Sequence, residues 1–202
     1  MVAAETPTEL TEKGAQTRAE ILRIAVDRFG RDGFRATSVA DIARDADVSG
    51  TLAYAYFDNK KALFLAALDA DVADLIHCGV SSVLETPGDD AWRTTLILTL
   101  LEALDHHPLA HRILAGKEPD VADRVVDLPA MEDLRLAVVA RIRADQEAGL
   151  IRADIDPEPI GGGIVNIFVS MLLAAVQFGT DEILHRGVDV LSVVAAAIDP
   201  VD

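Results

Sequence analysis

The stretch from Thr37 to Lys60 constrains the fold most, because it encodes two short helices separated by only a few residues. Ser38 precedes the first helix and Asp41 follows three positions later, a spacing that lets the serine hydroxyl cap an unpaired backbone N–H. Ser49 can cap the second helix, which is predicted to run to about Phe57. Residues 45–48 are left for the turn. Helices this short need neighbours to pack against, so the pattern predicts a helix-turn-helix inside a larger helical unit.

The supporting helix is predicted directly upstream, where apolar residues recur at helical spacing before a breaker at Gly30–Gly33. These residues are Ile21, Leu22, Ala25, Val26 and Phe29. The rest of a small core would come from Phe34, Phe57, Leu63 and Phe64. We therefore expect a three-helix head.

This head resembles that of the tetracycline-repressor (TetR) family of transcriptional regulators. The resemblance is specific within roughly the first 65 residues, and its matching residues stand in register: Thr17, Arg18, Ile21, Leu22, Ala25, Phe29, Gly33, Thr37, Ser38, Val39, Ile42, Ala43, Val48, Ser49, Tyr54, Tyr56, Phe57, Lys60 and Leu63. The resemblance implies a DNA-binding regulator, most often a repressor, that binds a palindromic double-stranded operator as a dimer.

Two departures from the family pattern fall in this stretch. Asp47 stands where members usually have glycine, at the end of the first helix, and aspartate tolerates the left-handed conformation better than most residues. The usual glycine-threonine-leucine triplet also comes one position early, as Gly50, Thr51 and Leu52. The second departure predicts an altered base preference and not a loss of DNA binding.

A helical wheel at about 100° per residue puts Gly50, Thr51, Tyr54 and Ala55 on one arc, with Ala53 and Phe57 pointing the other way. Thr51 can contact a base edge, Ala55 can lie against a thymine methyl, and Gly50 permits a close backbone approach. The remaining predicted DNA-binding residues would hold phosphates: Thr17, Arg18, Thr37, Ser38, Arg44, Ser49, Tyr56 and Lys60, together with Tyr54. For Thr37, Ser38 and Ser49, helix capping alone is the alternative.

The net charge of −16 by itself argues against nucleic-acid binding, but the charge is unevenly distributed. Residues 13–61 carry nine basic and seven acidic side chains, a net charge of +2. Residues 62–202 carry nine basic and 24 acidic side chains, a net charge of −15, and residues 1–12 hold the other three acids. The acidity therefore belongs to the second part of the chain, where it should repel DNA and help to orient the head.

No stretch alternates as a half-buried strand does, so the predicted fold is all-α, a helix-turn-helix head followed by a helical domain. The predicted division is a loose tail over residues 1–12, the DNA-binding head over 13–60, and an effector-binding and dimerisation domain over 61–202. Helices are expected over about 59–80, 89–107, 108–116, 118–127, 129–149, 159–178 and 181–198.

Residues 160–178 carry no charge, which on hydropathy alone fits a membrane span. Acidic flanks and the internal Asn166 and Gln177 favour instead a helix buried all round against a partner subunit. The resemblance implies that the last two helices pair with those of a second subunit in a homodimer bundle. A membrane is not among the expected partners. Its apolar candidates are Ile164, Phe168, Met171, Leu172, Ala175, Val188, Leu191, Val194 and Ile198.

The resemblance also implies a small-molecule pocket in the second domain, for an effector that the sequence does not identify. The candidate lining residues are Phe64, Leu68, Trp92, Leu96, Leu100, Met131, Leu134, Val138, Phe168 and Met171. For each of them, ordinary core packing is the alternative and the favoured one.

Groupings typical of catalysis are missing from the sequence: we find no phosphate loop, nucleophile elbow or zinc-protease pair, and we predict no metal or cofactor. Cys78 is the single cysteine, and the amino terminus has acids where a signal peptide has basic residues, so a cytoplasmic location is expected. Two classes remain: a ligand-responsive DNA-binding regulator, and an all-α enzyme or ligand carrier whose helix-turn-helix serves only packing.

Overall fold

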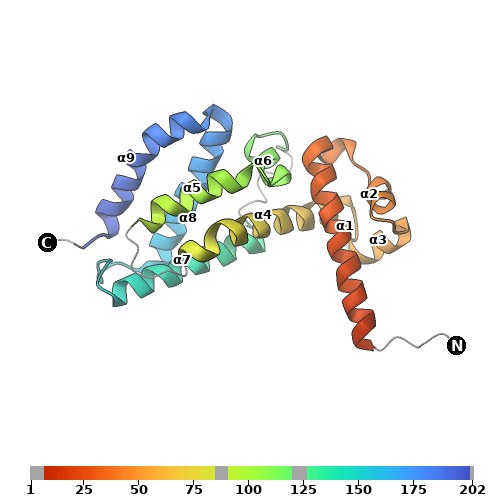
Figure 1. Cartoon of the computed structure of the whole chain (residues 1–202), viewed down its shortest axis with the longest axis horizontal. Coiled ribbons are helices and arrows are strands. Elements are labelled where there is room, and N and C mark those ends of the chain that lie inside the picture. Colours follow the sequence, from red (N-terminus) through yellow and green to blue (C-terminus); the bar gives the residue numbers. More distant parts are fainter. Residues whose placement is uncertain (1–6, 85–90, 120–126, 201–202) are drawn as a thin grey trace. The chain divides into compact units, whose positions relative to one another are not determined.

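The computed structural model describes residues 7–84, 91–119 and 127–200, and all the regular structure in these ranges is helical (Figure 1). The elements are α1 (Pro7–Ala36), α2 (Val39–Asp45), α3 (Gly50–Tyr56), α4 (Lys60–Leu84), α5 (Trp92–Leu104), α6 (Pro108–Leu114), α7 (Pro129–Glu147), α8 (Pro157–Phe178) and α9 (Thr180–Ile198). The chain divides into two compact units, Met1–Asp71 and Val72–Asp202. The predicted all-α fold is confirmed.

Helix α1 is longer than the sequence pattern indicated at both ends. It begins at Pro7, inside the predicted loose tail, because proline lacks only an N–H that a first helical turn does not use. It also continues through Gly30 and kinks at Gly33, where φ is 83° and ψ is 169°. The break is therefore made by one glycine near the end of the helix. Residues 1–6 of the predicted tail lie outside the described residues.

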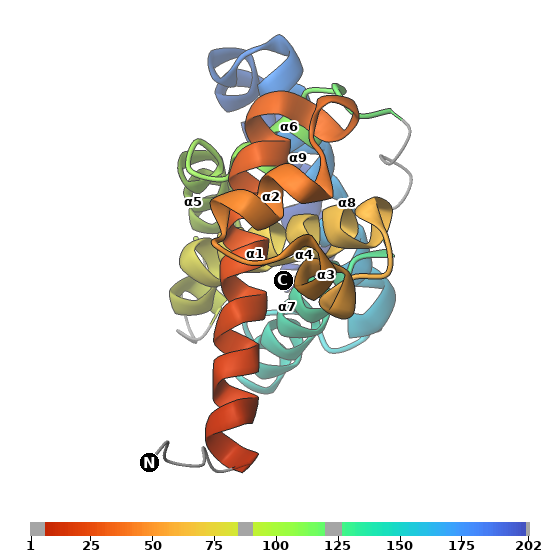
Figure 2. The ribbon, with the colours of Figure 1, turned by 90° about the vertical axis from the view of Figure 1, so that its right-hand side faces the viewer.

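The first unit is built on an aromatic cluster. Phe29 and Phe64 meet edge to face at a centroid distance of 5.0 Å, and Phe34 lies 5.2 Å from Phe64. Ile42 of α2 and Ala53 of α3 are fully buried; α2 packs against α1, and α3 packs against α2 (Figure 2). Burial of these side chains holds helices that would not persist alone.

The second unit is organised around α8, which packs along α7 and also contacts α5, α6 and α9. The approach of α7 and α8 depends on Gly161, since a Cβ built there would lie 2.6 Å from Cγ2 of Val139. Gly179, with φ at 102°, turns the chain from α8 into α9. The first two residues of the helix predicted over 89–107, and most of the helix predicted over 118–127, lie outside the described residues.

Within a single chain, helix α8 is buried on one face only, so its predicted burial all round against a partner subunit stays a prediction. One face is buried, through residues such as Ile164, Phe168 and Leu172, while Gly163, Asn166, Ser170, Leu173 and Gln177 form an exposed stripe. Polar side chains recur at helical spacing along this stripe, and the apolar Leu173 lies among them. Among the described residues, α8 has the length and hydropathy of a membrane span, but its buried face packs on four other helices, as in a core helix.

Candidate nucleic-acid interface

Hydrogen bonds fix the start of α2 and the turn that leads from α2 into α3. The Ser38 hydroxyl accepts from the Asp41 N–H at 3.1 Å and donates to the Asp41 carboxylate at 2.6 Å. After α2, the Val48 N–H donates to the Ala43 carbonyl at 2.9 Å. Asp47 has a φ of 53°, the only positive value at a non-glycine residue in the part of the chain that the structure describes. The predicted left-handed aspartate turn is confirmed.

Helix α3 presents the predicted arc to solvent. Its cap is Ser49, whose hydroxyl accepts from the Leu52 N–H at 3.1 Å. Gly50, Thr51, Tyr54 and Ala55 are exposed, with 54% of Tyr54 accessible, whereas Ala53 is fully buried. Seven residues give two turns, enough to offer one face to a groove while the other holds the helix to the head. Nothing lies within 4 Å of a Cβ built at Gly50.

The structure departs from the prediction at Thr37. This side chain is only 2% exposed, and its hydroxyl donates to the Gly33 carbonyl at 2.9 Å. The Gly33 carbonyl also accepts from the Thr37 N–H at 3.3 Å, so the Thr37 hydroxyl bonds inside the head. For Ser38 and Ser49 the capping role is observed.

Three cations predicted to contact DNA stand on the head and are held in place by neighbours. Arg18 lies over the ring of Phe57, at 5.3 Å from its centroid. Lys60 Nζ lies 4.6 Å from the Phe34 centroid and donates to the Arg35 carbonyl at 3.4 Å. Arg44 donates to Asp41 at 2.7 Å and remains largely exposed. Long side chains held in this way lose less freedom when they meet a phosphate.

Thr17 and Tyr56 are only partly exposed. The Thr17 hydroxyl donates to the Lys13 carbonyl at 2.9 Å, a bond within α1. The Tyr56 hydroxyl oxygen lies 3.4 Å from a Cβ built at Gly14, so α3 approaches the start of α1 here. Gly14 therefore leaves room for the Tyr56 ring end.

Sequence reasoning missed two features of this surface. Leu52 is 39% exposed on α3 and adds an apolar side chain next to the predicted arc. Arg28 of α1 donates to Asp45 at the end of α2, with Nε 2.6 Å from Oδ2. The two residues of that ion pair are 17 positions apart, so no local pattern could reveal it.

The Asp41 carboxylate is the clearest electrostatic feature of the head. The hydrogen bond from Ser38, followed by that from Arg44, lowers the pKa of Asp41 below its ordinary value. An ionised Asp41 in the first turn of α2 also interacts favourably with the amino-terminal end of the helix dipole. The Asp41 carboxylate therefore stabilises the first turn of α2, and it offsets part of the positive charge of Arg44.

The predicted effector residues are not gathered around one described cavity. Phe64 belongs to the aromatic cluster of the first unit. Trp92, Met131 and Met171 line three separate hollows of the second unit. The others are buried side chains: Leu68, Leu96, Leu100, Leu134, Val138 and Phe168. Within the described ranges, no group of three or more metal-ligating side chains occurs.

Comparisons with known proteins agree with this geometry. A family profile described as "Bacterial regulatory proteins, tetR family" matches residues 21–67. The HTH-type transcriptional repressor SCO4008 of Streptomyces coelicolor is 31% identical over 145 residues, which cover 71% of either chain. The HTH-type transcriptional repressor KstR2 of Rhodococcus jostii is 29% identical over 160 residues, 75% of this chain and 76% of the relative.

Among solved structures, a TetR-family transcriptional regulator from Mesorhizobium loti superposes with a TM-score of 0.66 at 20% identity. The match covers 97% of this chain and all of that one. The capped α2 and α3, their four-residue turn and the exposed arc of α3 define a helix-turn-helix DNA-binding protein. The chain belongs to the TetR family of bacterial transcriptional regulators, and it is a regulator and not an enzyme.

Proposed function

We propose that this protein is a repressor that binds a palindromic operator as a homodimer and is released by a small apolar or amphipathic effector. The observation that carries the proposal is the exposed arc of Gly50, Thr51, Tyr54 and Ala55, presented by a helix whose opposite side is buried in the head. Such a helix can enter the major groove without disturbing the core. The repressor names of SCO4008 and KstR2 support this direction of regulation. A bacterial repressor of this kind would act on chromosomal DNA in the cytoplasm.

Dimerisation through α8 and α9 is proposed from their exposed apolar side chains. Phe178 is 74% exposed, and Val188, Val190 and Val193 of α9 are also exposed, as is Leu173 of α8. Several exposed apolar side chains on two neighbouring helices support a subunit interface there. A two-fold dimer holds two heads at one separation, so the two half-sites of the operator must match that separation.

The effector would act by favouring a head separation that does not fit the operator. A difference of about 1 to 3 kcal/mol between the two arrangements is enough for this coupling. An apolar hollow lies between α5, α8 and α9 and has a volume of about 230 Å³. Its lining includes Ile97, Leu98, Leu101, Met171 and Leu191. Its chemistry fits an alkyl or similarly apolar group.

The proposal is tested by selecting bound fragments from a genomic DNA library at low salt and sequencing them. We expect the native chain to retain fragments that share an inverted repeat. Tyr54→Ala removes the largest side chain of the arc and should abolish this enrichment. Glu102→Ala, at an exposed position of α5, is the matched control and should retain the same fragments.

Absence of any common sequence with the native chain would refute operator binding. Equal enrichment by the native chain and by Tyr54→Ala would refute the role of α3. A ligand carrier that uses its helix-turn-helix only for packing predicts both of these results, so the selection separates the two functional classes.

A further inference from the structure

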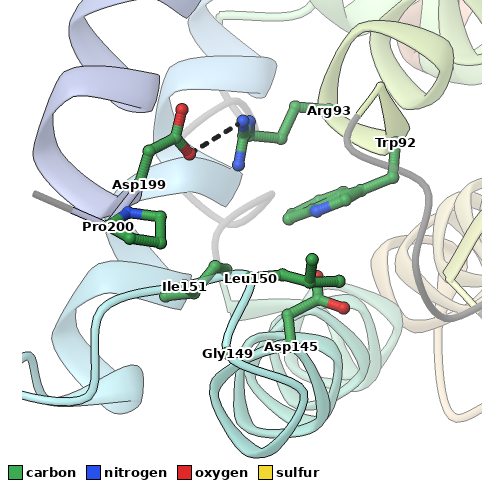
Figure 3. A pocket seen from close by; sticks show the side chains of 8 residues that line it. All are labelled: Trp92, Arg93, Asp145, Gly149, Leu150, Ile151, Asp199 and Pro200. Atoms are coloured by element: carbon green, nitrogen blue, oxygen red, sulfur yellow. Dashed lines mark hydrogen bonds and ion pairs between the residues drawn. The ribbon is translucent and has the colours of Figure 1, made fainter. Parts of the chain in front are cut away.

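A cavity of about 280 Å³ lies at the end of the second unit where α5 begins and α7 and α9 end (Figure 3). Its lining residues are Trp92, Arg93, Asp145, Gly149, Leu150, Ile151, Asp199 and Pro200. Of these residues, only Trp92 was predicted from the sequence to line a pocket. Unlike the hollow between α5, α8 and α9, this cavity combines an aromatic side chain with four charged groups in or beside its wall.

The charged groups are arranged as two ion pairs. Arg93 Nη2 lies 3.1 Å from Asp199 Oδ1 at the rim. Deeper in the wall, Arg141 Nε donates to Asp145 Oδ2 at 2.8 Å, and Arg141 Nη1 donates to the Val83 carbonyl at 3.0 Å. The Arg141 guanidinium also lies 5.4 Å from the centre of the Trp92 ring. The pairs leave the four groups with no net charge.

One acceptor in this wall is left over. Asp145 is 2% exposed, and its Oδ1 is the only buried side-chain nitrogen or oxygen atom without a hydrogen-bond partner in the described parts of the chain. A buried carboxylate oxygen without a hydrogen-bond partner is unfavourable, because it has lost its water and gained no donor. The cost is recovered when a donor occupies the cavity that Asp145 lines.

The walls of the cavity are held from several sides. The N–H groups of Leu150 and Ile151 both donate to the Asp145 carbonyl, at 2.8 and 3.3 Å. The Arg152 N–H donates to the Ile198 carbonyl at 2.9 Å, which ties the segment after α7 to the end of α9. Gly149, with φ at 75°, makes the turn that places Leu150 and Ile151 there. A site held in this way is largely formed before a ligand arrives.

We propose that this cavity binds a small organic amine, whose N–H group donates to Asp145 Oδ1 and whose carbon atoms lie against Trp92 and Leu150. The amine is favoured over an anion because the unsatisfied group is an acceptor and because residues 62–202 carry a net charge of −15. The volume suits a ligand below drug size. The site is separate from the proposed apolar effector site, and it does not depend on DNA release.

Trp92 is the only tryptophan of the chain, so its fluorescence and its indole N–H signal in NMR report on this cavity directly. Propylammonium chloride is the probe, and tetramethylammonium chloride, which has no N–H donor, is the comparison ligand. We expect a saturable response of Trp92 to propylammonium, and affinity at least tenfold weaker for tetramethylammonium. The full-length native chain is used at constant ionic strength.

Two variants test the assignment of the site. Asp145→Asn keeps an oxygen for Arg141 and turns an amide NH2 toward the cavity, so propylammonium should bind at least tenfold more weakly. Leu150→Phe fills part of the cavity without altering the Arg141–Asp145 pair, so it should also weaken propylammonium binding at least tenfold. This second variant keeps the test decisive should Asp145→Asn fail to fold. Asp154→Asn removes an exposed carboxylate from the segment between α7 and α8, outside the cavity lining, and should leave propylammonium binding unchanged.

The proposal is overturned if Trp92 gives no saturable response to propylammonium, or if tetramethylammonium binds equally well. It is also overturned if the folded Asp145→Asn or Leu150→Phe variant binds propylammonium with native affinity. A crystal grown with propylammonium that shows only water beside Asp145 Oδ1 would likewise contradict it.

Discussion

At the scale of single residues, Ser38 shows how a local signal in the sequence becomes a feature of the site. Its hydroxyl accepts from the Asp41 N–H and donates to the Asp41 carboxylate, as the spacing of these residues predicts. Thr37, one position earlier, looks equivalent in sequence but is buried under the kink at Gly33. The kink depends on a backbone conformation that sequence periodicity does not specify. The sequence therefore could not predict that Thr37 is buried while Ser38 caps α2.

Replacing Ser38 by alanine should destabilise the head by about 1 kcal/mol, because α2 loses its cap. The effect is measured by urea unfolding, with Ser170→Ala as control, since the Ser170 hydroxyl only bonds back to Asn166 within α8. The control should change stability by less than about 0.5 kcal/mol. Equal stability of the Ser38→Ala variant and the native chain would show that the cap contributes nothing.

The same substitution has a consequence for pH dependence. In the native head the pKa of Asp41 is lowered by Ser38 and Arg44, so the stability linked to it is present above the ordinary aspartate pKa and is lost as pH falls through the lower folded value. In Ser38→Ala the pKa of Asp41 should move up toward its ordinary value, as followed by carboxyl NMR. An unchanged pKa would contradict the assigned cause.

Lys60 and Thr51 are assigned different roles, phosphate contact and base contact. Lys60→Ala should weaken binding to all DNA sequences by nearly the same factor and reduce the slope of log affinity against log salt by about one. Fluorescence anisotropy on selected and scrambled fragments measures both quantities. Lys117→Ala in the second unit is the control. A loss confined to the selected fragment would contradict the phosphate role.

At the scale of helices, sequence periodicity located α2 to α9 where they fall in described residues, but it misplaced both ends of α1. The prediction placed a loose tail over residues 1–12 and a breaker at Gly30–Gly33. The helix instead begins at Pro7, since proline can open a helix, and a single glycine, Gly33, kinks it near its end. The close packing of α7 on α8 was also invisible, because it depends on which glycine faces which neighbour. Gly161 meets Val139, whereas Gly163, two positions later, has open space around it.

This pair of glycines gives a matched test of the contact between α7 and α8. Gly161→Ala should destabilise the protein by about 1 to 3 kcal/mol, because the new methyl overlaps Val139 Cγ2. Gly163→Ala has no such neighbour and should be neutral or stabilising by up to about 1 kcal/mol. Thermal unfolding compares the two variants. Val139→Ala should partly rescue Gly161→Ala, and absence of any rescue would place the strain elsewhere.

At the scale of the whole molecule, the division of charge explains how a strongly acidic protein can bind DNA. Excess acids lie beyond residue 61, and the head has a net charge of +2 over residues 13–61. The sequence was enough to show this division. It could not show which apolar residues line a cavity, because core packing and pocket lining use the same residue types. The structure distributes those candidates over a core and several hollows.

Val193 tests the proposed assembly, because it is among the most exposed apolar side chains of α9. Val193→Glu should convert the dimer to a monomer at micromolar concentration and weaken operator binding, since two linked heads bind more tightly than one. Light scattering gives the mass, and Leu136→Glu, at an exposed apolar position of α7, is the control. A native chain that is monomeric at this concentration would contradict the proposed α8–α9 bundle.

The central claim is that the exposed arc of α3 reads base edges. The most direct measurement repeats the DNA selection with the native chain and with Thr51→Ala, and compares base preferences position by position. We predict that Thr51→Ala still selects an inverted repeat but changes the preferred base at one symmetric position of each half-site. Identical base preferences for the two proteins would contradict the claim.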